Sequence, residues 1–64
     1  MLNSMLIINY IRYNKLSKEE FCKLCDMDTS TLDEIIYLGK YDTNTLKKIA
    51  KILNIGFYEF FSYE

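Results

Sequence analysis

The sequence predicts a compact all-α fold, a bundle of five short helices in one domain formed by residues 1–64. Apolar residues recur with helical spacing along almost the whole chain, which favours amphipathic helices over strands. The chain has no proline and only two glycines, so it has few of the residues that form the turns of a β-sheet protein. Half of the residues are apolar, which would give so small a domain the dense core that it needs.

The first two helices are predicted at residues 4–13 and 18–25. An apolar stripe with helical spacing indicates the first, and it consists of Leu6, Ile7, Tyr10 and Ile11. Ser17 and Glu20 have the S-x-x-E spacing of a capping box, so we expect the second helix to begin after Ser17. The inward face of the second helix would carry Phe21, Cys22, Leu24 and Cys25.

The pattern is interrupted at residues 26–28, which predicts a turn before a third helix at residues 29–37. Asp28 is a typical N-cap residue, and the dipole of the following helix favours its carboxylate there. The residues expected to face inward are Leu32, Ile35 and Ile36. Gly39 is the residue type that most often ends a helix, so we expect it to act as the stop.

Asp42, Thr43 and Asn44 offer caps for a fourth helix. Its apolar positions follow the i, i+3, i+4, i+7 pattern, and they are Leu46, Ile49, Ala50 and Leu53. We interpret Lys47, Lys48 and Lys51 as a solvated helix face rather than a nucleic-acid patch. Asn54 and Gly56 break the pattern, and the fifth helix is expected at residues 57–61.

Aromatic residues are concentrated at the C-terminal end of the chain. Five of them fall in seven residues, and they are Phe57, Tyr58, Phe60, Phe61 and Tyr63. These exceed what one short helix can bury. We expect them either to cover the core or, in part, to form the contact of a homodimer.

The second helix, the turn and the third helix form a helix-turn-helix arrangement. The stretches "LSKEEFCKLC", "STLDEI" and "NTLKKIAKILNI" make the match specific. On these features residues 16–61 resemble the Cro/CI-like (Xre-type) helix-turn-helix family of phage and bacterial repressors. The resemblance implies a lambda-repressor-like DNA-binding fold with its motif at about residues 17–38. It also implies a sequence-specific transcriptional regulator, repressor- or Cro-like, that inserts its third helix in the major groove.

The match extends to individual positions of the family's twenty-residue motif, counted here from Lys18. Its apolar fourth, eighth, fifteenth and eighteenth positions are Phe21, Cys25, Leu32 and Ile35. The ninth position is usually glycine, because the turn requires a positive φ. Here it is Asp26, which adopts that conformation more easily than most residues.

Carried over position by position, the resemblance places Thr29, Ser30 and Glu34 toward base edges, with Asp33 at the rim. Asp28 stands at the start of the same helix and joins this set. Thr and Ser discriminate weakly, whereas Glu can accept a hydrogen bond from the cytosine amine.

Phosphate contacts are expected from outside the reading helix. The residues that the resemblance implies are Lys18, Lys40, Tyr41, Thr43 and Asn44, with Lys15 and Lys23 extending the flanks. Thr43 and Asn44 would contribute the backbone N–H groups of a helix N-terminus.

The predicted reading helix is unusually acidic. The stretch "CDMDTSTLDEII", residues 25–36, holds four carboxylates and no lysine or arginine. Asp26 and Asp28 are explained as a turn residue and a cap, whereas Asp33 and Glu34 are not. Those two would either read cytosines while suppressing non-specific binding to DNA, or contact a protein partner instead of DNA. The alternative function is therefore a protein-interaction module, antirepressor-like or DNA-mimicking, that uses this acidic helix.

The net charge of −1 lacks the basic excess of a strong nucleic-acid binder, but distribution matters more than the sum. We expect double-stranded DNA and a second copy of the chain as partners. The N-terminal stretch "MLNSMLIINYI" lacks a signal peptide's basic region and is too short to span a bilayer. We therefore expect a cytoplasmic protein that makes no membrane contact.

Cys22 and Cys25 form a C-x-x-C pair, but tetrahedral zinc needs four ligands, and the chain has no other cysteine and no histidine. We interpret the pair as buried thiols. Nothing in the sequence resembles a nucleophile–base pair or a glycine-rich phosphate loop. We expect no enzymatic activity, cofactor, metal or small-molecule ligand.

Overall fold

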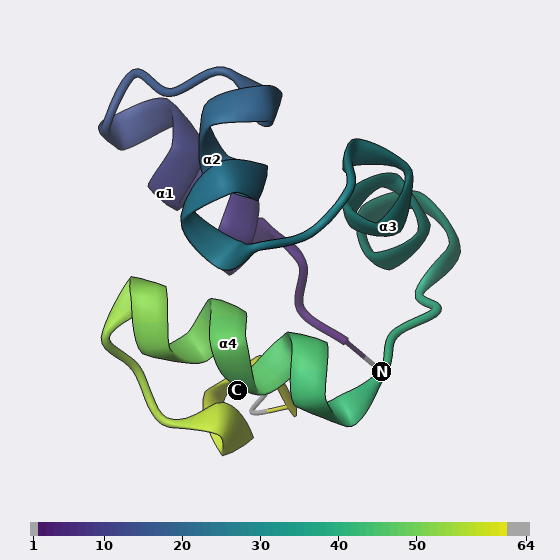
Figure 1. The fold of residues 1–64 in the computed structure, drawn as a ribbon. Helices are drawn as coiled ribbons and strands as arrows, with labels where there is room; N and C mark the ends of the chain where they lie inside the picture. Colours follow the sequence, from purple (N-terminus) through teal and green to yellow (C-terminus); the bar gives the residue numbers. More distant parts are fainter. Residues whose placement is uncertain (1, 62–64) are drawn as a thin grey trace.

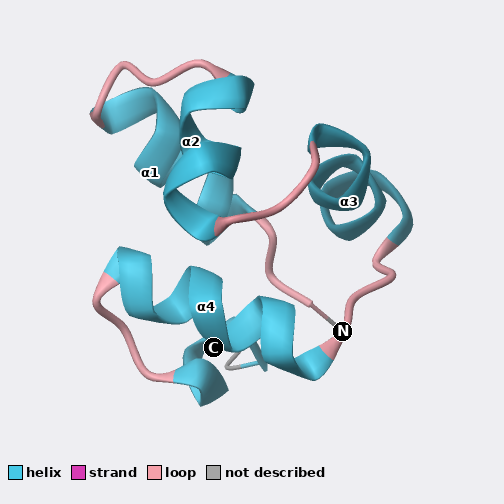
Figure 2. Cartoon of the chain, in the orientation of Figure 1, coloured by secondary structure: helices cyan, strands magenta, loops and turns pink. Residues whose placement is uncertain are grey.

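Helices make up most of the part of the chain that the structure, a computed structural model, describes: residues 2–61. They are α1 (Met5–Tyr13), α2 (Lys18–Cys25), α3 (Thr29–Asp33), α4 (Thr43–Leu53) and two irregular turns, the π-helical η1 (Glu34–Leu38) and the 3-10 turn η2 (Phe57–Phe61). No strand occurs among the described residues (Figure 2). The all-α prediction is confirmed, but the expected fifth helix is a single 3-10 turn.

The capping box at the start of α2 forms as the sequence predicts. The backbone N–H of Glu20 donates to Ser17 Oγ at 3.0 Å, and the backbone N–H of Ser17 donates to Glu20 Oε1 at 2.7 Å. Asp26 ends the helix in the left-handed conformation, with φ 55° and ψ 55°. The bounds of α2 therefore agree with the predicted residues 18–25.

The third helix differs from the prediction in its second half. It is α-helical only through Asp33, and the chain then widens into the π-helical turn η1. The backbone N–H of Lys40 donates to the Glu34 carbonyl at 3.1 Å, which closes this wide turn. Gly39 permits the closure because it takes a positive φ of 69°, so its predicted role as the stop is confirmed.

The fourth helix follows the predicted pattern. Asp42 is the N-cap, and its carboxylate accepts a hydrogen bond from the Thr45 backbone N–H at 3.2 Å. Asn54 ends α4 in the left-handed conformation, with φ 60°. Three of the four expected inward positions are buried, Leu53 is half-buried, and the three lysines of this helix are exposed.

The core draws residues from every helix and from both irregular turns. Its buried members are Ile7, Phe21, Cys22, Cys25, Leu32, Ile35, Leu46, Ile49, Ala50 and Phe60. Leu24 is the exception to the predicted inward face of α2, because its side chain is 52% exposed. The buried residues Phe21 and Cys25, four positions apart, define the inward face of α2, and Leu24 lies at the side of that face.

Helix α2 contacts both α3 and α4, and α1 contacts α4, so the four helices enclose the core (Figure 1). The backbone N–H of Asn3 donates to the Phe60 carbonyl at 2.8 Å, which joins the two ends of the described chain. The loop after η1 leads to the start of α4 on the same side of the molecule as α3 (Figure 1).

Candidate nucleic-acid interface

The turn between α2 and α3 has the geometry that a helix-turn-helix requires. The backbone N–H groups of Asp26 and Met27 donate to the carbonyls of Lys23 and Cys22, at 3.3 and 3.0 Å. The left-handed Asp26 then directs the chain into α3, so the prediction that an aspartate can replace the usual glycine is confirmed. Asp28 has the extended N-cap conformation, but its carboxylate makes no capping hydrogen bond and Asp28 remains exposed.

The expected base-reading residues occupy two neighbouring faces of the helical segment formed by α3 and the first residue of η1, Glu34. Ser30 and Glu34 are four residues apart and both are exposed, so they share the outer face of this helix. Thr29 and Asp33 are also four residues apart and are half-buried, so they lie nearer to α2. Ser30 and Glu34 are therefore the best placed of these residues to reach a ligand in front of α3.

Asp33 is held by Lys18 from the first position of α2. Lys18 Nζ lies 2.8 Å from Asp33 Oδ1, and each of the two side chains is 42% exposed. This is the only salt bridge found in residues 2–61. It joins two predicted site residues that the sequence assigned to different roles, one to phosphate and one to the rim of the reading helix.

The ion pair changes the charge of the reading helix. The hydrogen bond to Asp33 raises the pKa of Lys18 above its ordinary value, so this ammonium stays charged at neutral pH. Its positive charge offsets the negative charge of Asp33. No salt bridge neutralises the carboxylates of Asp28, the N-cap of α3, and Glu34, the first residue of η1. The acidic character that the sequence indicates is thus partly cancelled by a residue outside the helix.

The loop between η1 and α4 carries the other expected phosphate contacts. Lys40 is exposed directly after Gly39. The Tyr41 ring contacts the Phe61 ring, with centroids 5.8 Å apart, and remains partly exposed. Thr43 and Asn44 are exposed in the first turn of α4.

The N-terminus of α4 already has an anionic partner, Asp42, which is one of the three caps that the sequence offered for this helix. The Asp42 carboxylate accepts from the Thr45 backbone N–H and lies 3.4 Å from the Thr45 hydroxyl. A phosphate at this terminus would have to approach beside that negative charge. The signal was present in the sequence, because Asp42 precedes Thr45 by the spacing of an N-cap and its N3 residue.

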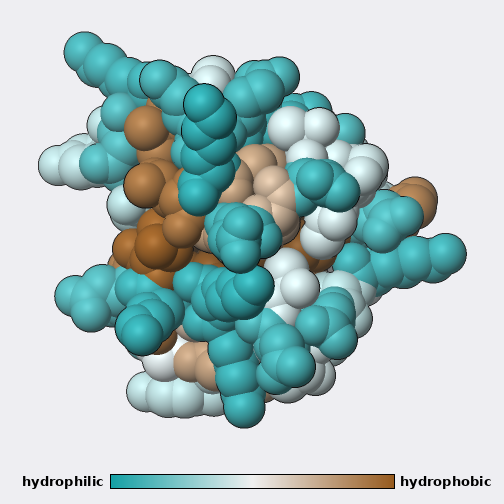
Figure 3. Space-filling model, viewed as in Figure 1, coloured by the Kyte–Doolittle hydropathy of each residue, from teal (hydrophilic) through white to brown (hydrophobic). Residues whose placement is uncertain are grey.

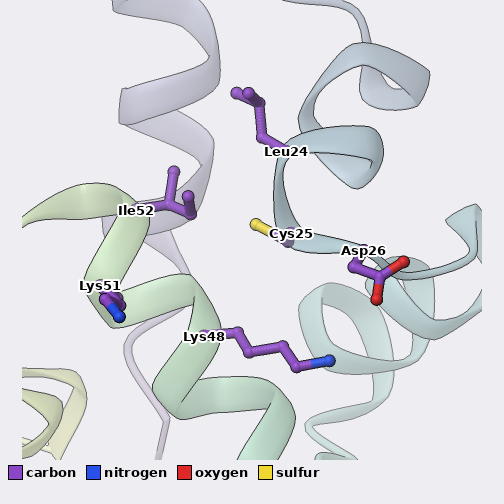
Figure 4. A pocket seen from close by; sticks show the side chains of 6 residues that line it. All are labelled: Leu24, Cys25, Asp26, Lys48, Lys51 and Ile52. Carbon is purple, nitrogen blue, oxygen red and sulfur yellow. The ribbon is translucent and has the colours of Figure 1, made fainter.

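A separate groove of about 200 Å³ lies between the end of α2 and α4 (Figure 4). It is lined by Leu24, Cys25, Asp26, Lys48, Lys51 and Ile52. In Figure 4 the Cys25 sulfur points into this space from α2, and Ile52 faces it from α4. A hydrophobic band also shows on this side of the molecule in Figure 3, bordered by hydrophilic side chains. None of the six lining residues belongs to the predicted DNA-binding set.

The two cysteines are free and buried, which confirms the interpretation of the C-x-x-C pair as core thiols. Desolvation by burial raises the pKa of both, and that of Cys25 reaches about 11. In the described part of the chain, no three histidine, cysteine, aspartate or glutamate residues come together as metal ligands would. No helix there has the length and apolar character needed to cross a membrane.

Comparison with known proteins identifies one family. The model of the Cro/C1-type HTH DNA-binding domain matches residues 2–64, which is nearly the whole chain. No curated protein and no solved structure gives a significant match.

Proposed function

The chain belongs to the family of Cro/C1-type HTH DNA-binding domains, and from this membership we propose that it is a sequence-specific transcriptional regulator. It would insert α3 into the major groove of double-stranded DNA, in a lambda-repressor-like arrangement in which η2 takes the place of a fifth helix. The family is one of DNA-binding rather than enzymatic domains. The observation that carries the proposal is the closed α2–α3 turn at Asp26, which leaves the outer face of α3 exposed.

The residues divide into base readers and phosphate contacts. Ser30, on the outer face of α3, and Glu34, at the start of η1 on the same face, would reach base edges, and the Glu34 carboxylate would accept from a cytosine amine. Thr29 and Asp28 would stand at the groove edge, at the N-terminal end of that helix. Phosphates would be held by Lys18, Lys40, Tyr41 and the backbone N–H groups of Thr43 and Asn44.

Few cationic contacts are available to each copy of the chain. About three or four neutralised phosphates give a salt slope of roughly −3 to −4, so a monomer would bind weakly at physiological salt. We therefore include a homodimer in the proposal, because two copies on two half-sites would about double the slope. Access to DNA and reduced thiols both fit a cytoplasmic protein.

Selection from random duplex DNA at about 50 mM salt tests the proposal, because phosphate contacts count most at low salt. The wild type should enrich one sequence that carries guanine–cytosine pairs at fixed positions. Glu34→Gln should then relax the preference at one base pair by about 1–3 kcal/mol. Folded protein that enriches no sequence would overturn the proposal.

One observation favours the protein-binding alternative. Beyond Glu34, the turn η1 exposes two large apolar side chains, Tyr37 at 72% and Leu38 at 65%. An acidic residue beside exposed apolar side chains suits a partner that is both basic and apolar. This function is favoured if the wild type binds no duplex at low salt and Glu34→Lys abolishes binding to a defined basic peptide.

A further inference from the structure

We propose that the Lys18–Asp33 ion pair is a specificity gate: it stays closed on non-specific DNA and opens at a site that gives both side chains new partners. Lys18 would turn to a phosphate, while Asp33 would accept a hydrogen bond from a cytosine amino group. This inference rests on the proposed DNA-binding function. In this proposal Lys18 and Asp33 together distinguish specific from non-specific DNA, which neither residue would do alone.

The geometry allows the exchange. The pair joins the first residue of α2 to the last residue of α3, with Nζ and Oδ1 2.8 Å apart. Both side chains are 42% exposed, so water and a ligand can reach the two charges. Exposed ion pairs are weak because solvent screens them, and a phosphate can therefore compete for the lysine.

The chemistry makes opening depend on the base. If Lys18 left for a phosphate while Asp33 found no donor, an unpaired carboxylate would remain beside the anionic backbone, which is unfavourable. A cytosine amine in the major groove supplies the missing donor. At guanine and thymine, which present only hydrogen-bond acceptors in the major groove, the closed pair is the better arrangement, so Lys18 stays with Asp33.

A closed pair has a measurable consequence on salt dependence. Each phosphate that a lysine neutralises contributes about 0.9 to the salt slope on duplex DNA. Lys18 should contribute this amount at the specific site and nothing on random-sequence DNA. Removing the charge of Lys18 should therefore change the salt slope on the specific site and leave the slope on random-sequence DNA as it was.

The experiment compares the full chain and its variants on a random-sequence duplex and on the duplex enriched by selection, by fluorescence anisotropy across salt. Lys18→Gln should flatten the slope by about 0.9 on the enriched duplex and leave it unchanged on the random one. Asp33→Asn should steepen the slope on the random duplex by the same amount, because it releases Lys18. Between about 50 and about 200 mM salt, its random-duplex affinity should fall roughly 3.5-fold more than that of the wild type. Adding Lys18→Gln to Asp33→Asn should remove this extra loss.

Glu19→Gln is the matched control, since it removes one exposed carboxylate next to Lys18 and leaves the ion pair intact. It should leave the random-duplex slope as in the wild type. The gate is overturned if Asp33→Asn and Glu19→Gln behave alike, or if Lys18→Gln flattens both slopes equally. Circular dichroism confirms that each variant folds. If the wild type binds and selects DNA but the variants do not show these differences in salt slope, the gate alone is refuted. If the wild type binds no duplex, the proposed function and the gate are refuted together.

Discussion

Asp26 shows how one residue can set the angle between two helices. It holds a φ of 55°, a conformation that costs about 1–2 kcal/mol for most L-residues and less for aspartate. Asp26→Gly should raise the free energy of unfolding by about 0.5–1 kcal/mol, because glycine adopts this conformation without strain. Urea denaturation of the variant measures the change.

Asp28 provides the control for this prediction. Its φ of −82° and ψ of 154° are open to any residue, so Asp28→Gly relieves no strain. It should lower the stability, because it adds flexibility to the unfolded chain and removes a carboxylate from the N-terminus of α3. If both glycine variants lose stability equally, the left-handed conformation at Asp26 carries no strain.

The buried thiol of Cys25 predicts a loss of stability at high pH. Burial raises its pKa from 9.0 to about 11, so the folded state favours the protonated thiol. The corresponding stabilisation is fully present below pH 9.0 and is lost as the pH rises through about 11. The free energy of unfolding should fall by at most about 2–3 kcal/mol over this interval. Urea denaturation of the wild type at several pH values measures this decline.

Cys25→Ala is the comparison that isolates the thiol, since the rest of the chain is the same in both proteins. The variant should show a smaller decline between pH 9.0 and about 11. Equal declines in the two proteins would mean that Cys25 is not the group responsible.

Side-chain roles at this scale were predictable where a local rule applied. Asp26 and Gly39 were identified because a positive φ admits few residue types. The Lys18–Asp33 pair was not predicted, because the two residues are fifteen positions apart and each was considered with DNA alone. No local pattern in the sequence indicates a contact that depends on how α2 crosses α3.

At the scale of elements, the start of α2 depends on the capping box. Ser17 Oγ accepts the Glu20 N–H at 3.0 Å, which satisfies one of the otherwise unpaired donors of the first turn. Ser17→Ala should lower the free energy of unfolding by about 1 kcal/mol. Thermal or urea denaturation followed by circular dichroism measures the loss.

Ser30→Ala is the matched change, because Ser30 is an exposed serine inside α3 rather than a cap. It should be neutral or slightly stabilising, since alanine is the better helix former. A similar loss in both variants would show that the effect of Ser17→Ala does not come from capping.

Helix bounds were predictable to the extent that capping residues mark them. The limits of α2 and the stop at Gly39 follow from residues with a physical reason to be there. The change from α3 to the wide turn η1 was not predicted, because apolar spacing near 3.6 residues describes both conformations over a single turn. The 3-10 form of η2 was not predicted either, because five residues are too few to define a helical period.

At the scale of the whole molecule, the aromatic C-terminal turn has a structural role that limits its role in assembly. Phe60 is buried, and the Phe61 ring contacts those of Tyr41 and Phe57 with centroids 5.8 and 5.5 Å apart. Phe61→Ser should therefore destabilise each copy, whatever it does to a dimer. Tyr63, the last of the expected contact residues, lies outside the described residues.

Tyr58 is the better test of a dimer contact at this end of the chain, because its side chain is 70% exposed. If the C-terminal aromatics join two copies, Tyr58→Ser should shift the mass measured by light scattering from dimer to monomer while the helical circular dichroism stays unchanged. The salt slope on the enriched duplex should then fall to about half, because one copy contacts one half-site. Tyr13→Ser is the control, since Tyr13 is also exposed but ends α1. A dimer that survives Tyr58→Ser places the interface elsewhere, and a wild type that is monomeric even on DNA removes the homodimer from the proposed function.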